Sequence, residues 1–458
     1  MVGRAVGAAA AVVLVLGGYA VADAADVVPG VLTTRPTPAD PLPFPDVELP
    51  AGAAAPPEAP GPDADAPVPT AAALAALAGD LRADERMAGS FGMVVADVLT
   101  GEVLLDDGGD TPRVPASSTK VLTAAAALDA LGPESTLETT VVRSGRDVVL
   151  VGGGDVLLGA GDSDPDAVVG RAGLADLAAQ TAASLREAGV TAVGVALDDT
   201  LFTGAPYAPD VTGADRNYVM PVQPVAVETG GAIGPGYVAD PALEAAETFA
   251  AALGAEGVEV TGPVRRAAAP AGAPPLAAVS SAPVAELVRH MLKVSENSVA
   301  EVLARLVAIE RGAAADFPGA AAAVPAQLGD LGIDVSGVTL VDGSGLSARN
   351  RIPPSVLVDV LVAGAGDAET LRGLVPGLPV GALDGTLADR LAGEAAGRVR
   401  AKTGTLIEAL SLSGTVVTTD GRLLAFAVLT DAVPAGAGLG TRTALDAWAQ
   451  AVAACGCS

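Results

Sequence analysis

Hydrophobic and polar positions follow one another along most of the chain with the periods of helices and strands. Leucines three to four residues apart predict a helix over residues 70–88. Apolar runs on either side of Thr100-Gly101, at residues 91–98 and 102–106, predict a β-hairpin. We therefore expect the folded body of the protein to begin near residue 70.

The C-terminal part of the chain carries the same kinds of pattern. Apolar runs at residues 410–417 and 423–428 predict a second hairpin that turns at Asp420-Gly421, and residues 441–454 predict a closing helix. Strands and helices at both ends of the chain indicate an α/β fold, in which an antiparallel sheet is flanked by helices and joined to a helical lobe.

A further region separates these two parts. Residues 147–151 and 192–197 have the composition of strands, and residues 174–188 and 241–253 have the periodicity of helices. One α/β unit does not require these additional elements. We therefore expect one or two inserted accessory domains over residues 143–280.

The N-terminus has the features of an export signal. Arg4 precedes an apolar run over residues 5–22. This order is typical of a secretory signal peptide over residues 1–25, and the run is also long enough for a retained membrane anchor. Residues 26–70 are rich in Pro, Ala and Asp and predict an extended linker without a core. Both alternatives predict an exported protein, in the cell wall or associated with the membrane.

The composition narrows the possible partners. The 458 residues carry a net charge of −28, which argues against nucleic acid or an anionic membrane surface as a partner. Aromatic residues make up 2%, so the core must be built from Val, Leu and Ala. Cys455 and Cys457 are the only cysteines. In an exported chain this even count favours a disulfide, and two thiols alone argue against a metal site.

The first candidate for chemistry is the pair Ser117 and Lys120. An Ala- and Leu-rich run that stops at Gly132-Pro133 predicts a helix, with Ser117 in its first turn and Lys120 on the same face. A serine hydroxyl becomes a nucleophile when a base takes its proton. Burial and the positive end of the helix dipole both lower the pKa of a lysine, so Lys120 could be that base. The same tetrapeptide, taken alone, also fits a simple N-cap.

Two later motifs favour the catalytic interpretation. Ser295-Glu296-Asn297 lies in a run that we predict to be helical from residue 290 to 305, and Lys402-Thr403-Gly404 follows a β-like stretch. The order Ser-x-x-Lys, Ser-x-Asn, Lys-Thr-Gly is the signature of penicillin-binding proteins and class A β-lactamases. We therefore expect a catalytic domain built from residues 71–142 and 281–458.

The single histidine supports a lysine base. His290 is the only histidine, so a zinc site built on several histidines is excluded. A Ser-His-Asp triad would have to use His290, which lies on an amphipathic helix and has the pattern of a packed or half-exposed helix residue.

Together with five further segments, the three motifs resemble those of the class C low-molecular-mass penicillin-binding proteins, the DacB-like serine D-Ala-D-Ala carboxypeptidases and endopeptidases, particularly the actinobacterial branch. The resemblance covers residues 80–445 and includes the long insertion after Ser-x-x-Lys. It implies the penicillin-binding/β-lactamase-like transpeptidase fold with a large inserted region. The segments that carry it are 150–155, 197–202, 291–297, 341–347 and 384–387.

The resemblance also implies roles for the motif residues. Ser117 would attack the carbonyl of the penultimate D-alanine while neutral Lys120 accepts its proton. Ser295 would pass that proton to the leaving amine, and Asn297 would hold Lys120 and the substrate amide. Water would then release the acyl group, with no metal or organic cofactor.

The Lys-Thr-Gly segment would recognise the substrate. Lys402 and Thr403 would bind the terminal carboxylate, with Gly404 beside them. Backbone N–H groups of Ser117 and Thr405 would form the oxyanion hole. The implied substrates are peptidoglycan stem peptides, and the implied inhibitors are β-lactam antibiotics.

Two alternatives and one accessory contact remain open. A serine β-lactamase would share the acylation step but needs a deacylating base, and the sequence lacks Glu-x-x-x-Asn in the expected region after Ser295. A non-catalytic cell-wall binding protein would be expected to have lost Ser117, Lys120 or Lys402, which are all present. In the inserted region, Asp198-Asp199 is either a solvated strand end or a contact for the amine of a diaminopimelate side chain, with Asp198 as the candidate substrate-binding residue.

Overall fold

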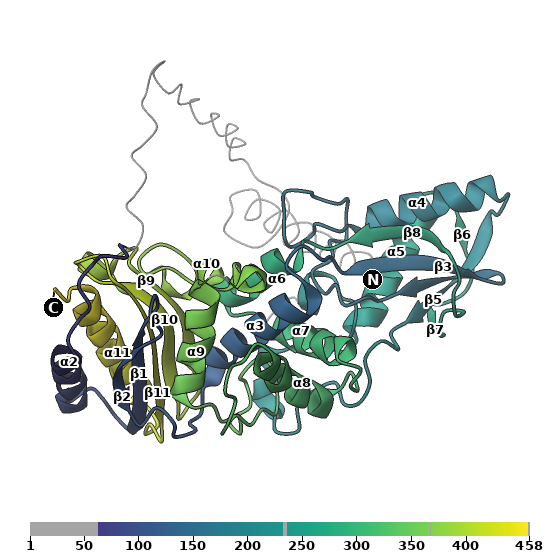
Figure 1. Cartoon of the computed structure of the whole chain (residues 1–458). Coiled ribbons are helices and arrows are strands. Elements are labelled where there is room, and N and C mark those ends of the chain that lie inside the picture. Colours follow the sequence, from purple (N-terminus) through teal and green to yellow (C-terminus); the bar gives the residue numbers. More distant parts are fainter. Residues whose placement is uncertain (1–62, 232–235, 367, 457–458) are drawn as a thin grey trace, which may run out of the picture. The chain divides into compact units, whose positions relative to one another are not determined.

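The computed structural model describes residues 63–231, 236–366 and 368–456 (Figure 1). The predicted signal peptide or anchor and residues 26–62 of the predicted linker lie outside the described residues. Within the described ranges, no helix is both long enough and apolar enough to cross a membrane.

The first sheet joins the two ends of the body. Its order is β2-β1-β11-β10-β9, and every neighbouring pair is antiparallel. Because β1 pairs with β11, Val94 lies opposite Ala427 and the N-terminal strands continue the C-terminal hairpin. Both predicted hairpins are confirmed. The strands are β1 Ser90–Asp97, β2 Val103–Asp107, β9 Val399–Thr405, β10 Leu410–Val417 and β11 Leu423–Asp431.

Helices cover both faces of this sheet (Figure 1). Helices α2 Ala71–Ala83 and α11 Gly438–Ala453 share a core cluster with Met93 and Val95 of β1. The alternate residues of β1 belong to the cluster that contains α9 Pro354–Ala365. The predicted N-terminal and C-terminal helices are confirmed, although α2 ends at Ala83, earlier than predicted.

The helical lobe is built around α3, whose residues from Thr119 to Leu128 are all buried. A helix that is buried on every side must be enclosed by others, and the alanines of α3 allow close packing. Helices α6, α7, α8 and α9 contact it. The lobe consists of α3 Thr119–Leu131, α6 Val284–Val294, α7 Asn297–Glu310, α8 Phe317–Asp330, α9 and α10 Leu374–Gly377.

The second sheet is mixed and lies within the predicted insertion and its flank. Its order is β6-β5-β4-β3-β8, and β7 also pairs with β5. Helices α4 Leu174–Glu187 and α5 Pro241–Ala255 share its main core cluster. The strands are β3 Glu138–Ser144, β4 Asp147–Val151, β5 Ala192–Asp198, β6 Glu259–Val260, β7 Arg265–Arg266 and β8 Pro275–Ser280.

The two strands and two helices predicted in this region are confirmed, whereas β3 and β8 were not predicted. Since β3 begins at Glu138, the sheet starts before residue 143, and the division of the chain into domains stays a prediction. Short 3₁₀ helices occupy the connections: η1 Ala116–Ser118, η2 Gly213–Tyr218, η3 Glu228–Gly230, η4 Glu369–Leu371, η5 Gly385–Leu387 and η6 Gly393–Ala395.

The last residues of the predicted linker differ from an extended tether. Arg422 forms a buried ion pair with Asp97 and donates to the carbonyl of Ala64 at 2.7 Å. Ala66 is buried as well. Residues 63–69 therefore have a fixed place beside the β10–β11 turn. At the other end Cys455 is disulfide-bonded, and Cys457 lies outside the described residues.

Candidate active site

Ser117 lies in a tight turn that close contacts hold in place. It belongs to η1, directly before α3, and the preceding Ala116 has a φ of 47°. A Cβ at Gly345 would lie 1.9 Å from the Ala116 carbonyl oxygen, and one at Gly404 would lie 3.0 Å from the Ala116 Cβ. The absence of side chains at these two glycines lets the neighbouring loop and β9 approach the turn. Ser117 itself remains partly exposed.

A group of serines fixes the same turn to the sheet. Ser118 Oγ lies 2.8 Å from Ser411 Oγ and accepts from Ser413 Oγ at 3.0 Å. Ser411 also donates to the Pro115 carbonyl at 2.7 Å. These residues were not predicted. The available signal was the alternation in Leu-Ser-Leu-Ser at the start of β10, which places both serines on one face of the strand.

The amine of Lys120 has three partners. Its Nζ donates to Asn297 Oδ1 at 2.5 Å and to the Ser344 carbonyl at 2.7 Å, and it lies 3.1 Å from Ser117 Oγ. The first two partners only accept hydrogen bonds, whereas a hydroxyl can also donate one. A neutral amine that gives its two N–H groups to those acceptors therefore directs its lone pair at Ser117.

Burial favours this neutral amine. The side chain of Lys120 is fully buried, and burial lowers its pKa from 10.5 to about 8. Asp342, Glu301 and Glu296 act in the opposite direction because their negative charges favour the ammonium. The expected face-to-face arrangement of Ser117 and Lys120 is present.

The prediction of one continuous helix through Ser295 is wrong. Helix α6 ends at Val294, and Ser295 has a left-handed backbone with a φ of 62°. The side chain of Glu296 then accepts from Ser298 N at 2.9 Å and caps α7, which begins at Asn297. Neither Gly nor Pro marks this break in the sequence. It brings Ser295 within 2.9 Å of Lys402 Nζ.

Lys402 and Thr403 lie on β9 beside this turn. Lys402 is fully buried, and its pKa is well below the usual value because of burial, with Lys120 and Arg390 adding positive charge nearby. Its Nζ also donates to the Thr403 carbonyl at 2.8 Å. Thr403 Oγ1 donates to Thr386 Oγ1 at 2.9 Å, a partner that the sequence did not indicate. Gly404 and Thr405 complete the strand.

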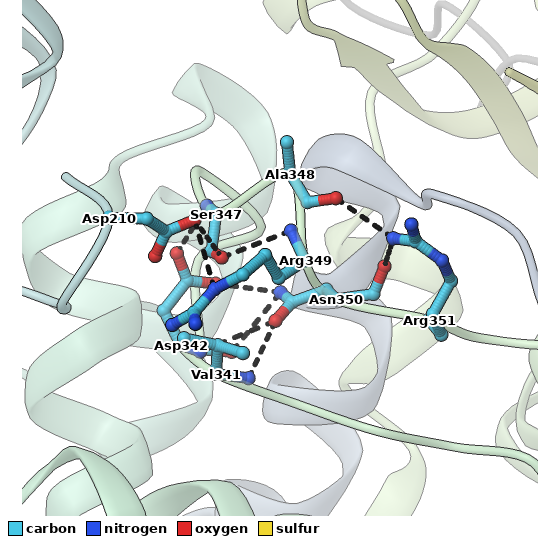
Figure 2. A network of polar contacts seen from close by, with 8 residues as sticks. All are labelled: Asp210, Val341, Asp342, Ser347, Ala348, Arg349, Asn350 and Arg351. Carbon is cyan, nitrogen blue, oxygen red and sulfur yellow. Dashed lines mark hydrogen bonds and ion pairs between the residues drawn. The ribbon is translucent and has the colours of Figure 1, made fainter. Parts of the chain in front are cut away.

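The loop from Val341 to Arg351 borders the site and is held by a polar network (Figure 2). The Asp342 carboxylate accepts from Asn350 Nδ2 at 2.7 Å and from Ser347 N at 2.5 Å. Ser347 Oγ in turn donates to Asp210 at 2.6 Å. This network connects the loop to a segment that precedes η2.

The same loop lines part of a pocket of about 630 Å³. Asp210, Arg351 and Leu406 are among the residues that line it, and Leu406 directly follows Thr405. One oxygen of Asp210, Oδ1, is buried and has no hydrogen-bond partner among the described residues. The pocket thus offers both signs of charge beside the motif strand.

Asp198 is not bonded to the residues described above. It ends β5, and its carboxylate accepts from Thr200 Oγ1 at 2.6 Å and from Ala269 N at 2.7 Å. Asp199 forms an ion pair with Arg266. These bonds account for the acidic pair as a structural feature of the second sheet, and a contact between Asp198 and substrate stays a prediction.

Two further expectations concern His290 and metals. His290 is half-buried on α6, and burial lowers its pKa. The hydrogen bonds of Ser117 and Lys120 described above do not involve it. Over the described ranges, no group of three or more His, Cys, Asp or Glu side chains could hold a metal ion.

Comparison with known proteins identifies the family of the chain. The model of the D-Ala-D-Ala carboxypeptidase 3 (S13) family matches residues 73–234 and 236–452. A carboxypeptidase of Mycobacterium tuberculosis is 38% identical over 382 residues, which cover 80% of each chain. A D-alanyl-D-alanine carboxypeptidase of an Actinomadura species is 31% identical over 74% of this chain and 77% of its own.

A solved structure is similar in fold. Penicillin-binding protein 4 of Haemophilus influenzae aligns with a TM-score of 0.64 and 21% identity, over 81% of this chain and 99% of its own. The expected penicillin-binding-protein fold is therefore confirmed. With a family match over nearly the whole body, the chain belongs to the D-Ala-D-Ala carboxypeptidase 3 (S13) family and is a serine-type D-Ala-D-Ala carboxypeptidase.

Proposed function

We propose that the protein hydrolyses the terminal D-Ala-D-Ala bond of peptidoglycan stem peptides through an acyl-enzyme on Ser117. The observation that carries this proposal is the environment of Lys120, whose Nζ has two pure acceptors and the Ser117 hydroxyl as neighbours. An amine in this setting is arranged to take a proton from Ser117.

The reaction proceeds by acyl transfer. Ser117 Oγ bonds to the carbonyl carbon of the penultimate D-alanine, and its proton moves to Lys120. Backbone N–H groups of Ser117 and Thr405 stabilise the oxyanion; losing one such donor typically costs roughly 10²–10³ in rate. The C–N bond then breaks, and Ser295 delivers a proton to the departing D-alanine. Water hydrolyses the ester and regenerates Ser117.

Recognition of the substrate uses the neighbouring strand and turn. The hydroxyl of Thr403 and the positive end of Lys402 meet the terminal carboxylate. Asn297 Nδ2 donates one hydrogen to the Tyr218 carbonyl at 2.8 Å, which leaves its second hydrogen for the substrate amide. Asp210 is a better candidate than Asp198 for the contact with an amine on the stem peptide, because Asp210 lines the adjoining pocket.

The same chemistry bears on inhibition and on cross-linked substrates. A β-lactam presents a reactive carbonyl and a carboxylate as the D-Ala-D-Ala terminus does, so we expect penicillins to acylate Ser117. Cross-linked stem peptides contain a D-alanyl bond of the same kind, and endopeptidase activity on them would use the same residues. The predicted export signal would bring the enzyme to these substrates outside the cytoplasm.

Intact-mass analysis after incubation with benzylpenicillin tests the proposal. Wild type should gain one adduct that peptide mapping places on Ser117, and it should release D-alanine from a D-Ala-D-Ala peptide. Ser117→Ala should do neither, whereas the exposed Ser135→Ala, which serves as a matched control, should behave as wild type. An adduct on another residue would contradict the assignment. Rapid hydrolysis of penicillin with no action on the peptide would instead support the β-lactamase alternative.

A further inference from the structure

A buried carboxylate lies behind the catalytic amine. Glu301 is in the second turn of α7, and its side chain is 3% exposed. Its two oxygens accept backbone N–H groups, one from Gly343 at 3.0 Å and one from Ser344 at 2.8 Å. Burial of a carboxylate is unfavourable unless donors compensate for the lost water. Here the donors belong to the loop that also contacts Lys120.

The same loop residues are bonded on their carbonyl side. The Ser344 carbonyl accepts one N–H of Lys120 at 2.7 Å, and the Gly343 carbonyl accepts from Thr123 Oγ1 at 2.7 Å. Lys120 and Thr123 lie one turn apart on α3. Residues 343–344 are therefore held between α7 on one side and α3 on the other. Glu301 is the residue that fixes their N–H groups.

We propose that Glu301 is a positioning residue for proton transfer: it holds Gly343 and Ser344 so that the Ser344 carbonyl takes one N–H of Lys120 and the lone pair stays directed at Ser117. The inference rests on the proposed function, because it requires Ser117 as nucleophile and Lys120 as base. Without this support the Ser344 carbonyl can move away from Lys120. The amine is then free to turn an N–H, in place of its lone pair, toward Ser117.

The charge of Glu301 has a second effect, on the pKa of Lys120, which can be measured separately from the effect on geometry. Carboxylates at Asp342, Glu301 and Glu296 all raise the pKa of Lys120. Burial and the neighbouring Asp342 raise the pKa of Glu301 itself to about 7. Above that pH the ionised Glu301 retains the proton on Lys120. Removing the charge should therefore let Lys120 lose its proton at lower pH.

Variants of Glu301 and Thr123 separate geometry from charge. Glu301→Gln keeps the size of the side chain, but its amide N–H₂ faces one of the two backbone N–H groups. We expect the plateau rate of acylation by benzylpenicillin to fall about tenfold or more. The pH at which the rate reaches half of its plateau should be about half a pH unit lower than in wild type. Thr123→Val removes the uncharged hydroxyl that supports the Gly343 carbonyl, so the acylation rate should fall without a shift of the pH profile. Thr123→Ser keeps a hydroxyl and should have a rate close to that of wild type.

Asp155→Asn is the matched control, because Asp155 is another buried carboxyl that accepts a backbone N–H, from Leu157 at 2.9 Å. It should retain the wild-type rate and profile. If wild type is not acylated on Ser117, the proposed function fails and this inference falls with it. If wild type is acylated while a folded Glu301→Gln matches its rate and profile, the inference alone is overturned. Should Glu301→Gln not fold, Glu301→Asp replaces it, because this variant keeps the charge and shortens the reach to Gly343 and Ser344; a wild-type rate in folded Glu301→Asp overturns the inference.

Discussion

Lys402 Nζ donates to Ser295 Oγ over 2.9 Å, so the motif strand β9 is bonded directly to the turn between α6 and α7. Two residues further on, Asn297 accepts from Lys120. The turn of residues 295–297 therefore contacts both motif lysines, one from the sheet and one from the helical lobe. Both amines are buried, and the charge of Lys120 lowers the pKa of Lys402 further. Burial lowers the pKa of Lys120 as well, so a proton that Lys120 takes is readily passed on to the leaving group.

Removing the amine of Lys120 should abolish acylation. Lys120→Ala lacks the base, and Lys120→Arg keeps a positive charge that cannot be lost at working pH. We expect the rate of acylation by benzylpenicillin, measured by intact mass over time, to fall at least about a thousandfold in both variants. General-base catalysis contributes a factor of up to about 10⁴ to a reaction rate. Thermal unfolding of each variant checks the fold. Acylation of Lys120→Arg at a wild-type rate would show that another group takes the proton.

The rate of acylation should depend on pH through Lys120. Its pKa is lowered to about 8, so below that pH the amine is protonated and cannot accept the proton of Ser117. The rate should rise about tenfold per pH unit at low pH and level off above about 8. Stopped-flow or quenched acylation with benzylpenicillin between pH 5.5 and 10 measures this limb. A profile that is flat between pH 6 and 9 would be incompatible with Lys120 as the base.

The motifs and most strands and helices could be predicted because they depend on local patterns. The Ala-rich sequence of α3 and the alternating sequence of β10 each have the local pattern of the element that they form. The break at Ser295 could not be predicted, because a left-handed serine is imposed by tertiary contacts and has no Gly or Pro signal. Glu301 and Thr386 were also missed, since their partners lie far away in the sequence and a single polar residue in a helix or loop carries no pattern.

Close packing against the nucleophile turn makes Gly404 intolerant of a side chain. A Cβ there would lie 2.1 Å from Ser411 Oγ and 2.8 Å from the Pro115 carbonyl. We expect Gly404→Ala to displace β9 from Ser117, with a lower melting temperature and acylation at least about tenfold slower. Gly79→Ala is the matched control, because a Cβ at that position of α2 meets nothing within 4 Å. Equal acylation rates in the two variants would contradict this account of the turn.

Asp155 should make the stability of the protein depend on pH. Burial raises the pKa of its carboxyl from 3.8 to about 7, so the folded state binds a proton that the unfolded state has already lost at pH 5 or 6. The stabilisation is complete below the unfolded pKa and is lost as the pH rises through about 7; its upper bound is about 4 kcal/mol. Asp155→Asn cannot ionise and should show a flatter dependence.

Denaturant unfolding of wild type and Asp155→Asn at pH 5 and pH 8 measures that difference. The free energy of unfolding of wild type should fall further between the two pH values than that of the variant. The asparagine oxygen can still accept from Leu157 N, so the hydrogen bond is kept in both proteins. Parallel changes in the two proteins would show that Asp155 does not titrate in this range.

Thr403 should determine how strongly the enzyme prefers a free terminal carboxylate. Lys402 donates to Ser295 and to the Thr403 carbonyl, and the Thr403 hydroxyl donates to Thr386. When substrate binds, we expect the Thr403 hydroxyl to turn its single proton from Thr386 to the carboxylate. A hydrogen bond to a carboxylate contributes about 1.5–3 kcal/mol. Thr403→Val keeps the shape of the side chain and removes the hydroxyl, whereas Thr403→Ser keeps the hydroxyl.

We expect Thr403→Val to lower kcat/KM on a D-Ala-D-Ala peptide by roughly 10- to 100-fold, because that range corresponds to the loss of one charge-assisted hydrogen bond. The loss should be much smaller on the same peptide with an amidated C-terminus, which carries no charge for the hydroxyl to meet. Thr403→Ser should remain close to wild type on both peptides. If Thr403→Val loses the same factor on both, the hydroxyl supports the strand without binding the carboxylate, and recognition must then come from Lys402 alone.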